Sequence, residues 1–128
     1  MPKKQIVTSE KAPKALGPYS VANRFGDFIF TAGQLGLVPE TGELAAGGIE
    51  AETYQALTNL SNVLQAAGSS LSQAVKTTVF LRDMNDFARM NTVYGQFFTQ
   101  NFPARSTVQV AALPKGGAVE IEIIAVIE

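Results

Sequence analysis

Residues 118–127, Ala-Val-Glu-Ile-Glu-Ile-Ile-Ala-Val-Ile, decide how this chain folds. In the first half of this segment two glutamates alternate with apolar residues, and the second half is apolar throughout. Alternation places Glu120 and Glu122 on one face of a β-strand, because successive side chains of a strand point to opposite faces. The apolar second half is typical of a strand that is covered on both faces. The segment therefore predicts a central strand of a sheet.

Five shorter segments predict the other strands of that sheet. They are rich in β-branched and aromatic residues, as strands usually are, and they span residues 5–7, 21–25, 28–31, 75–81 and 105–110. Gly26 and Asp27 separate the second segment from the third, and two residues is the length of a tight hairpin turn. Together the six segments predict a six-stranded sheet.

Two helices are predicted between the strands. Residues 49–67 carry an apolar stripe at helical spacing, which is formed by Leu57, Leu60, Leu64 and Ala67. A second helix is expected to begin at a cap provided by Asp83, Asn85 or Asp86. We expect it to end at Phe102, because the residue before Pro103 avoids the helical conformation. Its apolar face would consist of Phe87, Met90, Tyr94 and Phe97 or Phe98.

This order of elements predicts an α+β fold, in which a mixed six-stranded sheet carries both helices on one face. A chain of 128 residues has room for one domain, which would span residues 1–128. Only 16% of the residues are charged, whereas about 25% is usual for a soluble protein. Because no helix is left to cover the second face of the sheet, both observations predict that this face meets other copies of the chain.

The composition excludes several classes of chemistry. The chain has no histidine, cysteine or tryptophan, which excludes Ser-His-Asp hydrolysis, cysteine nucleophiles, disulfides and zinc sites made of thiolate or imidazole. We expect no cofactor and no metal site. A net charge of −1 without a basic stripe predicts no nucleic-acid partner. No apolar run is long enough for a bilayer, and the opening segment, residues 1–5, has no apolar leader, so a cytoplasmic location is expected.

Glu120 and Glu122 are the first candidates for chemistry. A carboxylate within a covered sheet is costly unless a cation or hydrogen-bond donors meet it, so at least one of the two should have a partner. The alternative is that the sheet is solvated at this point and that both glutamates are ordinary surface residues. The sequence leaves both interpretations open.

Arg105 is the second candidate. It follows a Phe-Pro-Ala segment and opens the fifth strand, where alternation puts it on the same face as Thr107 and Gln109. A guanidinium held there could bind a small carboxylate through two parallel N–H bonds. The simpler interpretation, which the residues alone favour, is an ion pair with Glu120 or Glu122, or a charged group that reaches water at the end of the sheet.

Three further positions carry weaker signals. Tyr19 lies in the turn Gly-Pro-Tyr-Ser at 17–20, where its ring could close a pocket or simply pack. Gly33 follows Ala32 at the end of a strand, where a ligand could approach the backbone closely, although a plain β-bulge is the simpler interpretation. Asn91 lies on the second helix away from its main apolar stripe, so it is expected at the surface.

Taken together, these segments resemble the RidA family, also called the YjgF/YER/UK group, over nearly the whole chain. The resemblance is carried by Gly-Pro-Tyr-Ser at 17–20, Phe-Thr-Ala-Gly-Gln-Leu-Gly at 30–36, Val-Lys-Thr-Thr-Val-Phe-Leu at 75–81, Met-Asn-Asp-Phe at 84–87, Asn-Phe-Pro-Ala-Arg-Ser at 101–106, Val-Ala-Ala-Leu-Pro-Lys-Gly at 110–116 and Val-Glu-Ile-Glu at 119–122. The spacing of the last three segments is highly specific.

The resemblance implies a chorismate-mutase-like fold that forms a homotrimer, with the sheets lining a central barrel and three equivalent clefts between subunits. It implies a 2-iminobutanoate/2-iminopropanoate deaminase, which hydrolyses reactive 2-imino acids and their enamine tautomers to 2-oxo acids and ammonia. Such imines are released by pyridoxal-phosphate-dependent dehydratases, so a functional link to these enzymes is implied.

The resemblance also implies roles for individual residues. Arg105 would hold the substrate carboxylate and Glu120 would position the attacking water. Tyr19 would help to close the cleft from the adjacent subunit. The remaining substrate contacts would come from Asn91, Ala32, Gly33 and Thr107.

Two positions depart from the family pattern, since Ala32 stands where serine is common and Thr107 where cysteine is common. The loss of a hydroxyl at position 32 removes one contact to substrate or water.

Two other functions are open to the sequence. One is a trimeric module that binds small carboxylates for regulation without catalysis. The other is the ribonuclease activity, with inhibition of translation, that is attached to some members of the family. Glu120 distinguishes the enzyme from the binding module, because a module that binds anions gains nothing from a carboxylate beside its ligand. The acidic composition and the lack of histidine oppose a ribonuclease.

The distance between the two main candidates depends on the order of the strands. If residues 105–112 and 118–127 formed a simple hairpin, Arg105 would face Ala125 and would lie about 17 Å from Glu120 along the strand. A shared site therefore requires another strand order or a neighbouring subunit.

Overall fold

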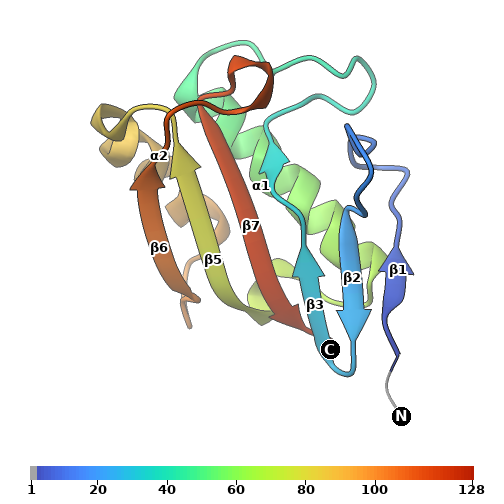
Figure 1. Ribbon diagram of the computed structural model, residues 1–128. Helices are drawn as coiled ribbons and strands as arrows, with labels where there is room; N and C mark the ends of the chain where they lie inside the picture. The colour runs from blue at the N-terminus through green and yellow to red at the C-terminus, as the bar shows by residue number, and fades with distance from the viewer. Residues whose placement is uncertain (1–2) are drawn as a thin grey trace.

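A mixed sheet of seven strands lies against two helices in this computed structural model, which describes residues 3–128 (Figure 1). Met1 and Pro2, which belong to the opening segment that was interpreted above as having no leader, lie outside the described residues. The strands follow the order β1-β2-β3-β7-β5-β6, and the short β4 pairs with β7 beyond the end of β3. Their bounds are β1 Gln5–Val7, β2 Ala22–Phe25, β3 Phe28–Thr31, β4 Gln34–Leu35, β5 Ala74–Leu81, β6 Ala104–Gln109 and β7 Val119–Val126.

The α+β prediction is confirmed, and so is the central position of the last strand. β7 pairs with β3 and β4 on one side and with β5 on the other, all antiparallel, whereas β5 and β6 are parallel. The prediction of six strands missed β4. This strand has only two residues, and Ala32 and Gly33 separate it from β3. It is therefore too short for an alternating pattern to reveal it.

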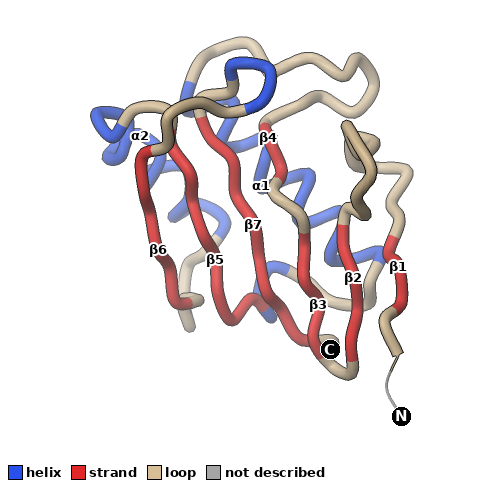
Figure 2. Tube along the Cα trace, viewed as in Figure 1, coloured by secondary structure: helices blue, strands red, loops and turns tan. Residues whose placement is uncertain are grey.

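Helices α1 (Ile49–Ala66) and α2 (Phe87–Phe97) lie together behind the sheet (Figure 2). The prediction for the end of α2 was wrong, because the helix ends five residues before Phe102. Phe98 leaves the helix in an extended conformation, and its buried ring stacks on Tyr94 with 4.5 Å between the centroids. Among the residues that the structure describes, no helix is long and apolar enough to cross a membrane.

The start of α2 was predicted more closely. A short 3₁₀ helix, Met84–Asp86, precedes α2, and the side chain of Asp83 accepts a hydrogen bond from the backbone N–H of Asn85 at its start. Asp86 occupies the N-cap position of α2, but its carboxylate pairs with Arg89 instead of capping the helix. Two of the three candidate caps therefore lie at helix starts.

The helices pack on only one of the two faces of the sheet. The face turned toward the helices holds the core, to which β7 contributes Val119, Ile121, Ile123 and Ala125. The opposite face, which we call the open face, has no helix over it. On this face several large apolar side chains are about half exposed, among them Ile6, Phe25, Phe28, Phe30 and Val108. The bare face that the sequence predicted is therefore present.

Asn59 of α1 fixes the backbone around β4. Its side chain is fully buried, and its Nδ2 donates hydrogen bonds to the backbone carbonyls of Leu35 and Leu37 at 3.2 and 2.9 Å. Its Oδ1 accepts a hydrogen bond from Nε2 of Gln55 at 2.9 Å. Because β4 is so short, these contacts replace the ladder of hydrogen bonds that a longer strand would have.

We expect Asn59→Leu to lower the free energy of unfolding by about 2–4 kcal/mol, because it leaves two buried carbonyls without a donor. Urea unfolding followed by circular dichroism measures this loss. Asn62→Leu is the matched control, since the Asn62 side chain makes a single hydrogen bond at the surface of the same helix, to the carbonyl of Lys11. Equal losses in the two variants would contradict the account.

Candidate active site

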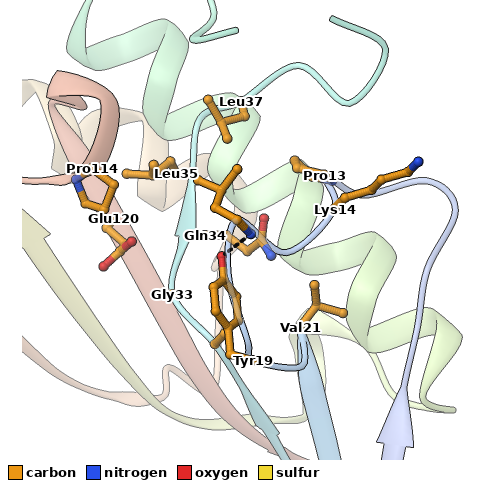
Figure 3. Close-up of a pocket in the computed structure, with 12 residues that line it drawn as sticks. Pro13, Lys14, Tyr19, Val21, Gly33, Gln34, Leu35, Leu37, Pro114 and Glu120 are labelled. Carbon is orange, nitrogen blue, oxygen red and sulfur yellow. Dashed lines mark hydrogen bonds between the residues drawn. The ribbon is translucent and has the colours of Figure 1, made fainter. Parts of the chain in front are cut away.

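A pocket of about 460 Å³ opens where the N-terminal loop passes over β4 and the start of β7. Four of the residues singled out from the sequence line it, namely Tyr19, Ala32, Gly33 and Glu120 (Figure 3). We call these four residues and the space between them the glutamate pocket. The rest of its wall is mostly apolar and includes Pro13, Leu16, Val21, Leu35, Leu37 and Pro114.

Glu120 enters this pocket from β7 because Gly33 leaves room for it. A Cβ atom on residue 33 would lie only 2.6 Å from Cδ of Glu120, so only glycine allows the backbone to pass this close to the carboxylate. Burial raises the pKa of the Glu120 carboxyl above its ordinary value, and the negative charge of Glu122 raises it further. Glu122 itself is exposed. The interpretation in which both glutamates are ordinary surface residues therefore fails for Glu120.

Tyr19 stands at the rim of the glutamate pocket (Figure 3). Its hydroxyl accepts a hydrogen bond from the backbone N–H of Leu16 at 3.0 Å, and its own N–H donates to the carbonyl of Gly17 at 2.8 Å. These two bonds close a tight turn that sets the direction of the ring. The side chain is 47% exposed, so it borders the pocket rather than packing in the core.

Arg105 lies elsewhere, over two aromatic rings. Its Cζ atom is 4.7 Å from the ring centroid of Tyr94 and 5.6 Å from that of Phe87, which are cation–π distances. Burial raises the pKa of the Tyr94 hydroxyl, while a hydrogen bond with Thr77 and the charge of Arg105 oppose that rise. The expected ion pair of Arg105 with Glu120 or Glu122 is absent, because within residues 3–128 the only side-chain ion pairs are those of Arg89.

Asn91 and Thr107 lie on the same side of the sheet as Arg105. Thr107 follows Arg105 by two residues on β6, and Asn91 is on α2, four residues after Phe87 and three before Tyr94. Oδ1 of Asn91 and Oγ1 of Thr107 are buried and have no hydrogen-bond partner within the described chain. Asn91 as a whole is only partly buried, so it lies at the surface as predicted while its Oδ1 points inward. We call Arg105, Asn91 and Thr107 the arginine patch.

The glutamate pocket and the arginine patch are separated within one chain. β5 lies between β6 and β7, so the hairpin considered above does not form. Thr77 of β5 is opposite Arg105 on one side and Ile123 on the other, which places Arg105 about 10 Å from Glu120 along the strands and about 10 Å across them. Arg105 faces the helices, whereas Glu120 lies on the opposite face of β7 from the core residues Val119 and Ile121. A small ligand of one chain therefore reaches only one of the two groups.

The sequence did not identify the two aromatic residues that contact the Arg105 guanidinium. Phe87 and Tyr94 were assigned to the apolar face of α2, and their spacing of seven residues was a sign that both rings would lie in one row. Leu35, Leu37 and Pro114 were also missed as pocket walls, although Leu35 and Pro114 belong to segments that carry the family resemblance. No group of three or more acidic residues that could hold a metal ion occurs among residues 3–128.

Comparison with known proteins identifies the family of this chain. A family model described as Endoribonuclease L-PSP matches residues 9–127. The 2-iminobutanoate/2-iminopropanoate deaminase of Bos taurus is 52% identical over 123 residues, which cover 96% of this chain and 90% of that protein.

Solved structures share the fold. The crystal structure of RidA from an Antarctic Psychrobacter bacterium is similar with a TM-score of 0.93 and 46% identity, over 96% of this chain and 99% of that one. E. coli TdcF, solved with bound serine, is similar with a TM-score of 0.92 and 42% identity, over 97% of this chain and 99% of that one.

Proposed function

Because this chain belongs to the RidA (YjgF) family, whose model is described as Endoribonuclease L-PSP, we propose that it hydrolyses short 2-imino acids and their enamine tautomers to 2-oxo acids and ammonia. The observation that carries the proposal is Glu120, a half-buried carboxylate with a raised pKa that lines the glutamate pocket. The deaminase name of relatives near 50% identity supports the same activity. The serine bound to E. coli TdcF is a molecule of the same size and carries the same carboxylate.

We further propose that the active site forms between subunits. Arg105 and Glu120 face opposite sides of one sheet, so a second copy of the chain must supply the missing group. β6 is the last strand of the sheet, which leaves the arginine patch at an edge that a neighbour can reach. The apolar open face supplies the surface for assembly. A homotrimer whose sheets line a central barrel would bury this face and create three equivalent clefts.

In such a cleft, the guanidinium of Arg105 binds the substrate carboxylate through two parallel N–H bonds. Its cation–π contacts with the rings of Tyr94 and Phe87 fix the plane of the guanidinium. The unpartnered oxygens of Asn91 and Thr107 accept hydrogen bonds from the substrate nitrogen or from water. The backbone at Gly33 and the ring of Tyr19 close the other side, with Ala32 as an apolar contact.

Glu120 handles the proton of the attacking water. The water oxygen forms a bond to the carbon of the C=N group, and Glu120 takes one proton from it. Glu120 then returns this proton to the nitrogen of the resulting carbinolamine, and the C–N bond breaks with its electron pair going to nitrogen, so that ammonia leaves. The hydroxyl proton passes to Glu120 as the C=O bond of the 2-oxo acid forms, and from there to ammonia or solvent. An iminium carbon is already electrophilic, so these steps need no covalent nucleophile. The raised pKa suits Glu120 to both accepting and returning a proton.

The substrate would come from a reaction that releases an unstable imine, such as that of a pyridoxal-phosphate-dependent dehydratase. We expect the hydrolysis of these imines to take place in the cytoplasm. A freshly generated solution of 2-iminobutanoate tests the activity directly, with ammonia and 2-oxobutanoate as readouts. The proposal requires product release well above the spontaneous rate, whereas saturable binding without turnover would identify the regulatory module instead.

A ribonuclease is the second candidate only because the family description names that activity. The chain has a net charge of −1 and no histidine, so it lacks both a basic surface for a phosphate backbone and the usual acid–base group. Incubation with single-stranded RNA, followed by gel electrophoresis, is therefore expected to show no cleavage.

Gly33→Ala is expected to reduce kcat/KM by about 10²-fold, because a Cβ atom 2.6 Å from Cδ of Glu120 must displace the carboxylate that positions the water. The same assay of imine hydrolysis measures the loss. Gly95→Ala is the control, since a Cβ atom on this α2 residue meets no atom within 4 Å. A fully active Gly33→Ala enzyme would show that the close approach at residue 33 has no part in catalysis.

A further inference from the structure

Glu122 is a charged group of the open face that the mechanism above leaves unused. It follows Glu120 by two residues on β7, so the two carboxylates stand on the same face of one strand, about 7 Å apart along it. Thr78 of β5 lies opposite Glu122, and Phe80 lies opposite Glu120. Neither of these neighbours carries a charge that could offset the two carboxylates.

Among residues 3–128, no ion pair joins Glu122 to a cation. Lys76 is a cation on the same face, and it lines a small cavity of about 120 Å³ together with Glu122. The ammonium of Lys76, however, donates to Oγ of Ser106 on β6 at 3.1 Å, and no ion pair joins it to Glu122 in the described part of the chain. Within the described part of one chain, the carboxylate of Glu122 therefore has no ion-pair partner.

No other charged group around Glu120 forms an ion pair with it among residues 3–128, and the guanidinium of Arg82, directly after β5, donates to the carbonyl of Gly116 at 2.8 Å. Lys14 and Tyr19 come from the N-terminal loop and line the pocket on its outer side. The ammonium of Lys115, in the loop before β7, donates to the carbonyl of Gly42. Glu52 of α1 is on the helix side, where its carboxylate accepts a hydrogen bond from the N–H of Ala118. Glu122 is thus the charged residue that shares both the strand and the face of Glu120.

We propose that Glu122 is a positioning residue for the reaction, which acts through Glu120 by placing a second negative charge on the same face of β7. This proposal rests on the proposed function, because it assigns a role to Glu122 in the proton transfers of Glu120. A neighbouring negative charge makes Glu120 a stronger base, so it takes the proton of the water more readily. The pKa of Glu120, which Glu122 raises, agrees with this direction.

The role of Glu122 differs from that of Glu120. Glu120 touches the reacting water, and its loss stops the chemistry. Glu122 sets the proton affinity of that group, so its loss should shift the pH range of the reaction and slow it only slightly. In the proposed trimer the open faces turn toward one another, where water screens the pair less than at a free surface.

The test compares Glu122→Gln with Glu43→Gln, which removes the same charge from an exposed loop. Two readouts are followed in the full-length protein, namely the acid limb of kcat/KM against pH and the ¹³C NMR titration of the Glu120 side-chain carboxyl. Glu122→Gln is expected to move both midpoints about half to one pH unit lower and to reduce kcat at neutral pH about two- to threefold. Glu43→Gln should leave both midpoints in place.

The NMR titration separates this proposal from the proposed function. If the wild-type protein hydrolyses no imine, the function fails, and the titration still reports whether Glu122 acts on Glu120. If the wild type is active and Glu122→Gln gives the same two midpoints as Glu43→Gln, the role of Glu122 is overturned. Sedimentation and circular dichroism of each variant show that the comparison is made on folded protein of one oligomeric state.

Discussion

Arg105→Lys is expected to raise the KM for 2-iminobutanoate about 10²-fold while leaving kcat within a few-fold of the wild-type value. A lysine ammonium is a point charge, so it replaces the two parallel N–H bonds of a guanidinium by a single contact. It also loses the flat stacking on Tyr94 and Phe87 that holds the group in place. Steady-state kinetics with freshly generated substrate measures both constants.

Arg89→Lys is the matched control for this prediction. Arg89 is on α2 like the rings under Arg105, but its charge pairs with Asp86 and Glu50 at the surface. We expect this variant to keep the wild-type KM. Saturation of Arg105→Lys at near-normal substrate concentration would refute the assignment of Arg105 to the substrate carboxylate.

Glu120→Gln is expected to lower kcat by about 10²–10⁴-fold, the usual contribution of a positioned general base. An amide can still hold a water by a hydrogen bond, but it takes no proton from it. KM should change little, because the carboxylate of the substrate is bound by another residue. Unchanged turnover in this variant would remove Glu120 from the mechanism.

The same substitution has a distinct effect on stability. Folding raises the pKa of Glu120, so the stability that this group contributes is present below its unfolded pKa and is lost as the pH rises through the folded value. Glu120→Gln should therefore be as stable as the wild type, or more so, at pH 8, and it should lose that advantage at pH 4. Urea unfolding at both pH values checks this sign. A loss of stability at pH 8 would instead mean that the ionised carboxylate supports the fold.

Much of the fold could be predicted because its signals are local. The six strands other than β4, and α1, agree with the residues that alternation and helical spacing marked, with differences of at most one residue at each end. The end of α2 could not be predicted, because it depends on the burial of Phe98 against Tyr94. β4 depends on Asn59, 24 residues away from Leu35, which no short-range pattern contains.

The candidate site was predictable residue by residue but not as an arrangement. The cost of burying a carboxylate marked Glu120, and the rigid turn before Arg105 marked that residue. Whether the two side chains meet is decided by which strand lies between β6 and β7 and by the register of each pair. Strand order is a property of the whole chain, so the separation of the two groups appears only in three dimensions.

The claim on which the account depends is that each active site takes Arg105 from one subunit and Glu120 from another. Co-expression of Arg105→Ala and Glu120→Gln chains, each with its own affinity tag, gives mixed oligomers that carry both tags. In a trimer that carries both kinds of chain, one of the three clefts, or about one third, combines an intact arginine with an intact glutamate. We predict that the mixed oligomers recover about that fraction of wild-type activity, although each variant alone is nearly inactive. Activity no greater than that of the two separate variants would contradict the account.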